Sequence, residues 1–451
     1  MSRTKIRILI MLLLPLLSNA QQQMDINDLV ENALGNSYNI IEARYQSEIS
    51  KQNTNEAWST ILPQASAKVD YKNNFELPVM IVPGEMFGAP GEEIEAQFGK
   101  AQSLDAGISI NTQLFNLYSI YNISVSKKAE DLYKLSEIKT EEDIIYNTYS
   151  LYYNLLLLYK SQYVINNNLE SITELYNSTS GLVESGMALQ TDLDRIYLIL
   201  SDLDINKSSI KNNIEIQKRY LGFYTGIESS TNWDIDTTGS NRIFTDLSLT
   251  DWGVNNLSYN SVVDYQLLNK QLEINDFQLK SQKSKYLPTL SAFYTNNYQA
   301  QSDEFNFLSN DARYNNYSLG GIQLSIPLFT GGRTNANIQK AKINTKSTIN
   351  KINQVEESIQ IEYTKAIQNY ETNYNQCHSQ RKNKSLAHDI FKQTDLKYRE
   401  GLASLTDVLL AENDVRESEL EYAKYCLQLK ACELEILKVS GELKTLINKT
   451  K

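Results

Sequence analysis

Two widely separated segments share one outline, and this repeat limits the folds that the sequence can adopt. The segments VESGMALQTDLDRI (183–196) and YREGLASLTDVLLA (398–411) carry Gly, Ala, Thr and Asp at the same spacing. Gly401 follows Gly186 by 215 residues, and each glycine interrupts a run with helical spacing. If the chain is duplicated, other landmarks must recur at a similar interval.

The duplication continues upstream in two pairs of segments that read as strands. ILPQASA (61–67) matches YLPTLSA (286–292), and ISINTQLF (108–115) matches IQLSIPLF (322–329). The segments of the first matching pair lie farther apart in the sequence than those of the second pair. The first half must therefore carry extra residues between its two strands. That insert contains ELPVMIVPGEMFGAPG (76–91), whose prolines and glycines predict a loop. Ordered repetition of this length predicts two structural repeats.

Apolar and polar side chains alternate along the predicted strands, which gives each strand one apolar and one polar face. The apolar set is Ala65, Ala67, Val69, Tyr71, Ile108, Ile110, Thr112, Leu114, Leu290, Ala292, Tyr294, Ile322, Leu324, Ile326 and Leu328. The polar set is Ser66, Lys68, Asp70, Lys72, Ser109, Asn111, Gln113, Ser291, Thr295, Gln323 and Ser325. The pattern fits either a half-buried sheet of a soluble protein or strands that cross an outer membrane.

Aromatic residues crowd the segment ends, which favours the membrane strands because such strands carry aromatic girdles. These residues are Phe75, Phe293, Tyr298, Tyr314 and Tyr317. A barrel of this kind needs at least about eight strands, so one chain cannot close it. The chain must then oligomerise to hide its sheet edges, and a ring of about twelve strands leaves a wider lumen than one of eight.

The N-terminus reads as a secretory signal peptide. Residues 1–20 (MSRTKIRILIMLLLPLLSNA) combine a basic start, a short apolar stretch and small residues before a cleavage site after Ala20. A signal anchor is the alternative, but the apolar stretch is too short to span a bilayer. No second apolar run of about 18 residues follows, so the sequence predicts no transmembrane helix.

The composition argues against several functional classes. The net charge is −11 and the basic residues are scattered, which argues against nucleic acid as a partner. Three cysteines and two histidines show neither metal-ligand spacing nor an HExxH motif. No nucleophile with a nearby base is recognisable. We therefore expect no enzyme, no cofactor and no metal.

Two long helices are expected, from Asn116 to Gly186 and from Gly331 to Gly401. At 1.5 Å per residue, each would extend roughly 100 Å. The C-terminal helix carries two stripes that repeat every seven residues: Val415, Tyr422, Leu429 and Ile436, and Leu420, Leu427 and Leu434. The stripes lie about 140° apart around the helix, which indicates a neighbour on each side. The core of an ordinary bundle is the alternative.

Each of the two repeated glycines stands where a long helix must reverse its direction. Glycine adopts the left-handed backbone that ends a helix. Thr191 and Asp192 then begin one return helix, and Thr406 and Asp407 begin the other, where such side chains are favourable.

The cysteines can be placed on the second hairpin. If it turns near Gly401, Cys377 and Cys426 lie level on adjacent helices and are a possible disulfide pair. Cys426 and Cys432 lie six residues apart on one helix, so their side chains point about 120° away from each other.

This ordered combination resembles the TolC family of outer-membrane efflux channels over nearly all of the mature chain. The resemblance rests on the duplicated Leu-Pro strand start, the IPLFTGGR junction (326–333) and the YxxGxxxxxDVL pattern (398–409). It implies a mainly α fold with a small β portion, in which long antiparallel coiled-coil helices form a trimeric α-barrel. Four strands per chain would contribute to a 12-stranded transmembrane β-barrel.

The resemblance also implies a function. The chain would be a passive exit duct of a tripartite efflux or secretion system, in the outer membrane of a Gram-negative bacterium with a large periplasmic part. Its partners would be two more copies in a homotrimer, outer-membrane lipid, a periplasmic adaptor (a membrane fusion protein) and an inner-membrane transporter of RND, ABC or MFS type. The alternative is a periplasmic coiled-coil scaffold or adhesin with a soluble sheet.

The expected division of the chain follows the repeat. It comprises a signal peptide (1–20), a first repeat (21–225), an equatorial linker (226–257) and a second repeat (258–451). Each repeat would hold a helix, two strands (within 64–115 and 289–328), a long helix, a tip near 186 or 401, and a return helix.

The resemblance places the gate at the helix tips. Asp407 matches a carboxylate ring at the periplasmic entrance, Asp192 is its repeat equivalent, and Tyr398 matches a tyrosine that partners this network. Two positions depart from the family pattern: Ala403 stands where some members carry a gate arginine, and Leu410 where some carry a second aspartate. Simple helix capping by the two aspartates is the alternative role.

The turns themselves are the candidates for docking an adaptor. Small side chains let a helical hairpin approach the backbone, and Leu402 offers an apolar anchor. The candidate residues are Gly186, Met187, Ala188, Gly401, Leu402 and Ala403.

Overall fold

The computed structural model describes residues 22–228, 230–237, 241–245, 249–250, 252, 257–310 and 312–448. The predicted signal peptide lies outside these residues. The chain forms two compact units. The helical unit comprises the described parts of Met1–Ser47, Leu132–Asn269 and Asn350–Lys451, and the sheet unit comprises Glu48–Asp131 and Lys270–Ile349. Each unit therefore draws segments from both predicted repeats.

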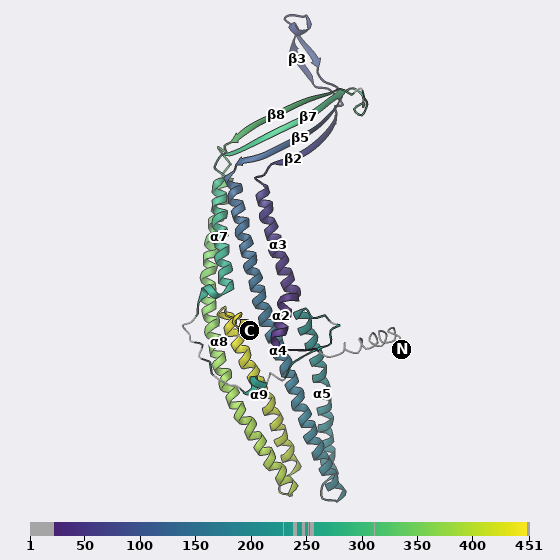
Figure 1. Ribbon diagram of the computed structural model, residues 1–451, viewed down its shortest axis with the longest axis vertical. Coiled ribbons are helices and arrows are strands. Elements are labelled where there is room, and N and C mark those ends of the chain that lie inside the picture. Colours follow the sequence, from purple (N-terminus) through teal and green to yellow (C-terminus); the bar gives the residue numbers. More distant parts are fainter. Residues whose placement is uncertain are drawn as a thin grey trace, which may run out of the picture. The chain divides into compact units, whose positions relative to one another are not determined.

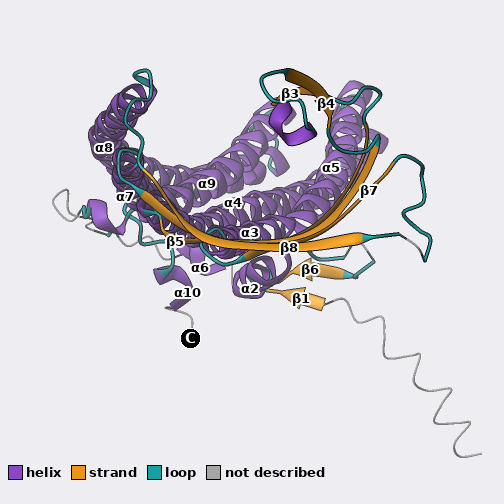
Figure 2. Ribbon diagram, turned by 90° about the horizontal axis from the view of Figure 1, so that it is seen from above, coloured by secondary structure: helices purple, strands orange, loops and turns teal. Residues whose placement is uncertain are grey.

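The sheet unit is built on one antiparallel sheet of four strands in the order β2-β5-β7-β8 (Figure 1). The strands are β2 (Gln64–Asn73), β5 (Gln102–Phe115), β7 (Thr289–Ser302) and β8 (Tyr314–Ser325). The strands bow along their length (Figure 2). Among the described residues, β2 and β8 each pair on one side only, so the sheet keeps two open edges.

The strand register confirms the predicted alternation of faces. Residues directly opposite each other in an antiparallel pair share a face. Ile110 stands opposite Ala65 on β2 and opposite Tyr294 on β7, which makes one apolar face. Ser109 stands opposite Ser66, and their hydroxyls form a hydrogen bond of 2.9 Å on the other face.

The apolar face of this sheet lies open in the single chain. Val69 is 68% exposed and Ile322 is 70% exposed. Two aromatics predicted at segment ends, Phe293 and Tyr298, lie inside β7, and Phe293 is on the polar face. A side chain at Gly321 would stand 2.9 Å from the Phe293 ring, so the glycine makes room for the aromatic.

Two predicted strand features need correction. The last strand ends at Ser325, so Ile326 and Leu328 lie beyond it. Pro327 lacks the backbone N–H that a continued ladder would need. The insert predicted as a loop contains a hairpin of β3 (Val79–Pro83) and β4 (Glu93–Gln97), joined through a 3₁₀ turn.

The helices follow the predicted layout. They are α2 (Ile26–Asn36), α3 (Tyr38–Ser59), α4 (Leu117–Glu184), α5 (Gln190–Thr225), α6 (Asn241–Thr245), α7 (Val263–Ser284), α8 (Arg333–Arg399), α9 (Leu405–Val439) and α10 (Thr445–Asn448). The two long helices have 68 and 67 residues, as expected from the glycine positions. Among the described helices, none carries an apolar stretch able to cross a membrane.

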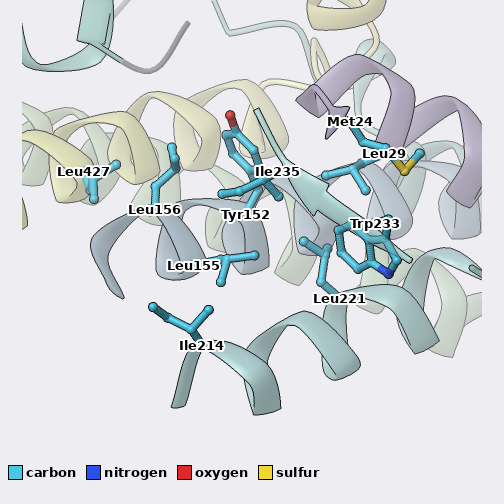
Figure 3. Close-up of a cluster of buried hydrophobic side chains, with 10 residues drawn as sticks. All are labelled: Met24, Leu29, Tyr152, Leu155, Leu156, Ile214, Leu221, Trp233, Ile235 and Leu427. Atoms are coloured by element: carbon cyan, nitrogen blue, oxygen red, sulfur yellow. The ribbon is translucent and has the colours of Figure 1, made fainter. Parts of the chain in front are cut away.

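The largest apolar cluster joins six elements of the helical unit (Figure 3). Tyr152, Leu155 and Leu156 of α4 pack with residues of α2, α5 and α9 and with β1 (Gln22–Met24) and β6 (Trp233–Ile235), which pair in parallel. Trp233 and Ile235 are buried, and both come from the linker (226–257) whose role the sequence left open. The linker thus contributes a strand that closes this core.

The two stripes of α9 face two different neighbours, as predicted. Leu429 and Ile436 pack against Tyr363 and other residues of α8. Leu434 of the second stripe packs against Ile145 of α4. A helix that packs between two neighbouring helices needs both stripes. Burial of these apolar side chains supplies much of the stability of such a layer of helices.

Each return helix ends near a glycine whose backbone lies close to a carbonyl oxygen of another segment. Gly226 ends α5 with φ +76°, and Gly441 follows α9 with φ +74°. An added Cβ would lie 2.4 Å from the Asn36 carbonyl oxygen at Gly226 and 2.3 Å from the Ser261 carbonyl oxygen at Gly441. Both the left-handed backbone and the close approach therefore require glycine.

We predict that Gly226→Ala and Gly441→Ala each lower the free energy of unfolding by roughly 2–4 kcal/mol, because strain and a backbone clash add. Gly186→Ala is the matched control: its φ is +73°, but nothing lies within 4 Å of the added carbon. The control should cost about 1–2 kcal/mol, as measured by thermal unfolding in detergent. Equal losses for all three variants would refute the close-contact explanation.

Candidate functional site at the helix tips

The tips reverse by the same turn in both hairpins. Gly186 and Gly401 adopt left-handed backbones, with φ of +73° and +74°. In both turns the residue after the glycine donates its N–H to a carbonyl of the preceding helix at 2.8 Å. This is the Schellman pattern that ends helices on glycine, so the predicted reversal is confirmed.

Apolar side chains from both hairpins meet behind these turns. Ile172 and Leu175 of α4 cluster with buried residues of α5 and with Leu405 and Val408 of α9. Phe391 of α8 packs against this cluster. A shared apolar core therefore holds the tips of the two hairpins together, and the polar contacts at the surface add to this packing.

Asp407 lies in a capping box at the start of α9. Its backbone N–H donates to the Ser404 hydroxyl at 3.3 Å, and its carboxylate accepts from the Ser404 backbone N–H at 3.0 Å. The Ser404 hydroxyl also contacts the carboxylate at 2.7 Å. These hydrogen bonds hold the pKa of Asp407 below its ordinary value. Asp407 thus performs the capping role that the sequence left as an alternative.

The other two predicted gate residues lie elsewhere in the tip. Tyr398 forms a hydrogen bond of 3.2 Å with the Thr179 hydroxyl, which links α8 to α4. Asp192 lies in the first turn of α5, whose cap, Leu189, has no side-chain oxygen to accept a hydrogen bond. Within the described part of the chain, no hydrogen bond joins Tyr398, Asp192 and Asp407 to one another.

A second polar link between the hairpins involves a residue that the sequence analysis missed. Arg195 of α5 donates from Nη1 to the Thr406 hydroxyl at 3.0 Å. This arginine stands in the first hairpin, whereas the family pattern led us to look at Ala403 in the second. The Ser404-x-x-Asp407 spacing could have revealed the capping box from sequence. We see no sequence signal for Arg195.

A buried carboxyl lies between α4, α8 and α9 above the tips. Glu412 borders two cavities of about 130 and 140 Å³, the second of which is also lined by Asn168. The Asn168 amide is buried and has no hydrogen-bond partner among the described residues. Burial raises the pKa of Glu412 to about 7, while the charge of Arg416 opposes that shift. The polar lining makes these cavities suitable for ordered water.

The docking candidates form the outermost surface of the two turns. Met187 is 73% exposed and Leu402 is 74% exposed, although both are large and apolar. Gly186 and Gly401 have open space where a side chain would stand. Ala188 and Ala403 are partly buried behind them.

The predicted cysteine pair lies on the second hairpin behind the tip. Cys377 and Cys426 are free thiols whose sulfur atoms are 2.8 Å apart. In the described residues, no group of three His, Cys, Asp or Glu side chains could hold a metal ion.

Comparison with known proteins identifies one domain and the fold. Residues 268–442 match the family model for outer membrane efflux protein. No curated protein matches the chain.

Solved structures match over almost the whole length. VceC of Vibrio cholerae, an outer membrane protein, has a TM-score of 0.69 and 15% identity, over 92% of this chain and 96% of its own. The CmeC outer membrane channel of Campylobacter jejuni has a TM-score of 0.72 and 15% identity, over 96% and 92%. The open state of the MtrE outer membrane channel of Neisseria gonorrhoeae has a TM-score of 0.69 and 14% identity, over 93% and 89%.

These matches confirm the resemblance that the repeat and its motifs suggested. Identities this low establish the fold alone, and the family model covers residues 268–442, fewer than half of the chain. Residues 268–442 are thus similar to the outer membrane efflux protein family, and the chain shares its fold with solved outer-membrane channels.

Proposed function

We propose that this chain is the outer-membrane exit duct of a tripartite efflux or secretion system. Three copies would pool their sheets into one ring across the outer membrane, and their long helices would enclose a periplasmic passage. The observation that carries this proposal is the four-stranded sheet with two open edges and an exposed apolar face.

The dimensions of the sheet suit a membrane. Its strands have 10, 14, 14 and 12 residues. A tilted strand needs about 9–11 residues to cross the hydrocarbon core. The alternative, a soluble scaffold or adhesin, would have to cover the apolar face with protein and to blunt both edges. Pairing the open edges between copies satisfies their backbone groups, which is required inside a bilayer.

The partners follow from the proposed duct. A passive channel needs an energised pump in the inner membrane, of the proton-driven RND or MFS type or the ATP-driven ABC type, and a periplasmic adaptor that joins the two. The exposed apolar residues Met187 and Leu402 at the glycine turns suit an adaptor's helical hairpin.

The membrane face can be tested with two neighbouring substitutions on β5. Ile108 lies on the apolar face and Ser109 on the polar face. We predict that Ile108→Lys removes the protein from the outer-membrane fraction, because a lysine facing lipid costs about 2–4 kcal/mol near the bilayer midplane. Ser109→Lys should leave a trimer that resists detergent until heated and that conducts ions in planar bilayers.

A water-soluble monomer would contradict the proposed duct and support the scaffold. Equal tolerance of both lysines in the membrane fraction would contradict the assignment of the faces.

The proposed gate adds a second role to the acidic groups at the tips. In a trimer, three copies of Asp407 would face one axis, attract cations and raise one another's pKa. Asp192 would form the matching set in the first hairpin. The Tyr398–Thr179 and Arg195–Thr406 hydrogen bonds would hold the two hairpins of each copy together in the closed state.

Gating and capping by Asp407 can be separated because two residues make the cap. Ser404→Ala and Asp407→Asn both weaken the capping box. Only Asp407→Asn removes the charge. We predict that Asp407→Asn changes single-channel conductance and block by divalent cations at least several-fold, whereas Ser404→Ala changes neither. If the two variants have the same conductance and the same block by divalent cations, Asp407 has the capping role alone.

Docking can be tested at Gly401, where an added side chain meets open space. We predict that Gly401→Glu abolishes efflux while trimers still form, because a bulky charge blocks the approach of the adaptor. Gly401→Ala shares the backbone strain without the charge, so it should retain most efflux. The measurements are the growth of cells exposed to a compound that the pump exports, and crosslinking of the channel to the adaptor. Normal efflux by Gly401→Glu would refute docking at this turn.

A further inference from the structure

Two cysteines of the second hairpin meet inside the helical unit. Cys377 of α8 and Cys426 of α9 lie on either side of the turn at Gly401. Their sulfur atoms are 2.8 Å apart, about 0.8 Å more than the roughly 2.05 Å of a disulfide bond. Both residues are buried, with exposed fractions of 0% and 1%.

The surroundings of the two sulfurs are mainly aromatic. Tyr422 completes the buried cluster, and Phe244 and Tyr425 pack against it. The Tyr422 hydroxyl donates to the backbone carbonyl of Phe244 and also interacts with the Cys426 sulfur, which lowers the pKa of that thiol.

We propose that Cys377 and Cys426 are an oxidation site that forms an intrachain disulfide between α8 and α9. The two S–H bonds break and one S–S bond forms. The two electrons and the two protons pass to the disulfide of a thiol–disulfide oxidant, whose S–S bond breaks to give a dithiol. The reaction in the cell rests on the proposed export of the chain, because disulfides persist in oxidising compartments.

The electrostatics assign unequal roles to the two sulfurs. The hydrogen bond from Cys377 lowers the pKa of the Cys426 thiol, and the charges of Arg381 and Lys384 act in the same direction. The same pairing raises the pKa of Cys377. In the closed hairpin Cys426 is therefore the better thiolate of the two. Since the folded pair is buried, the oxidant must reach it before α8 and α9 close.

The third cysteine provides an internal control. Cys432 lies on α9 six residues beyond Cys426, so it points about 120° away. The Asn373 amide donates to its sulfur at 3.5 Å. Neither of the other sulfurs is placed to bond with Cys432.

The disulfide would clamp one hairpin only. At the 215-residue interval of the repeat, the first hairpin carries Gln162 and Lys211 in place of the two cysteines. The α8–α9 hairpin would then move as one body, while α4 and α5 stay free to shift against each other. Opening of the tips would change the contacts between hairpins and leave the α8–α9 pairing intact.

The test counts thiols on the full chain isolated from cells, with an alkylating reagent added in denaturant and the mass read before and after reduction. We expect one alkylated cysteine before reduction and three after it. The Cys432→Ser variant should show none before reduction, and Cys426→Ser should show two. Trypsin cleavage after Arg399 should give two fragments that separate only when a reductant is added.

A second arm separates the oxidation site from the proposed export. The full chain is reduced in denaturant and refolded into detergent with oxidised glutathione. Formation of the Cys377–Cys426 bond in this arm supports the site, even if protein from cells has three free thiols, a result that would count against export. Three free thiols in both arms, or a bond that includes Cys432, would overturn the proposal.

Discussion

The unpaired edges of one sheet impose the main constraint on this protein. Backbone N–H and C=O groups along the outer sides of β2 and β8 need partners, and the described residues of one chain do not supply them. The apolar face between those edges, with Val69 and Ile322 exposed, adds a second demand, because contact of apolar surface with water is unfavourable. Association between copies within a lipid bilayer meets both demands at once, and this is why the proposed duct follows from the sheet more directly than from any side-chain motif.

Long-range pattern was the most reliable guide to the fold. The glycines at 186 and 401 located both reversals because few residues other than glycine accept a left-handed backbone. The two stripes of α9 identified two neighbours because burial follows the helical period over many turns. Short elements were missed for the opposite reason. The segment Val79–Pro83 is apolar without alternation, so nothing in it distinguished a strand from a loop.

The site was predicted less well than the fold, because its contacts depend on which helices meet. Asp407 was expected to join a network with Tyr398, yet its carboxylate binds Ser404 three residues away. Local hydrogen bonds of this kind form without help from tertiary structure and therefore compete well with distant partners. Arg195 and Thr406 lie in different hairpins, and only the packing of α4, α5, α8 and α9 brings them together.

The two glycines at the ends of the return helices mark the internal repeat of the chain. Gly226 meets the carbonyl of Asn36 and Gly441 that of Ser261, so the last long helix of each half touches a segment near the beginning of the same half. Each half therefore repeats the same close contact at the end of its last long helix, although the two halves share cores and one sheet. In the proposed ring of three chains, this contact would recur six times around the axis. The two halves have diverged around it, because the hairpin of β3 and β4 lies in one half and the thiol pair in the other.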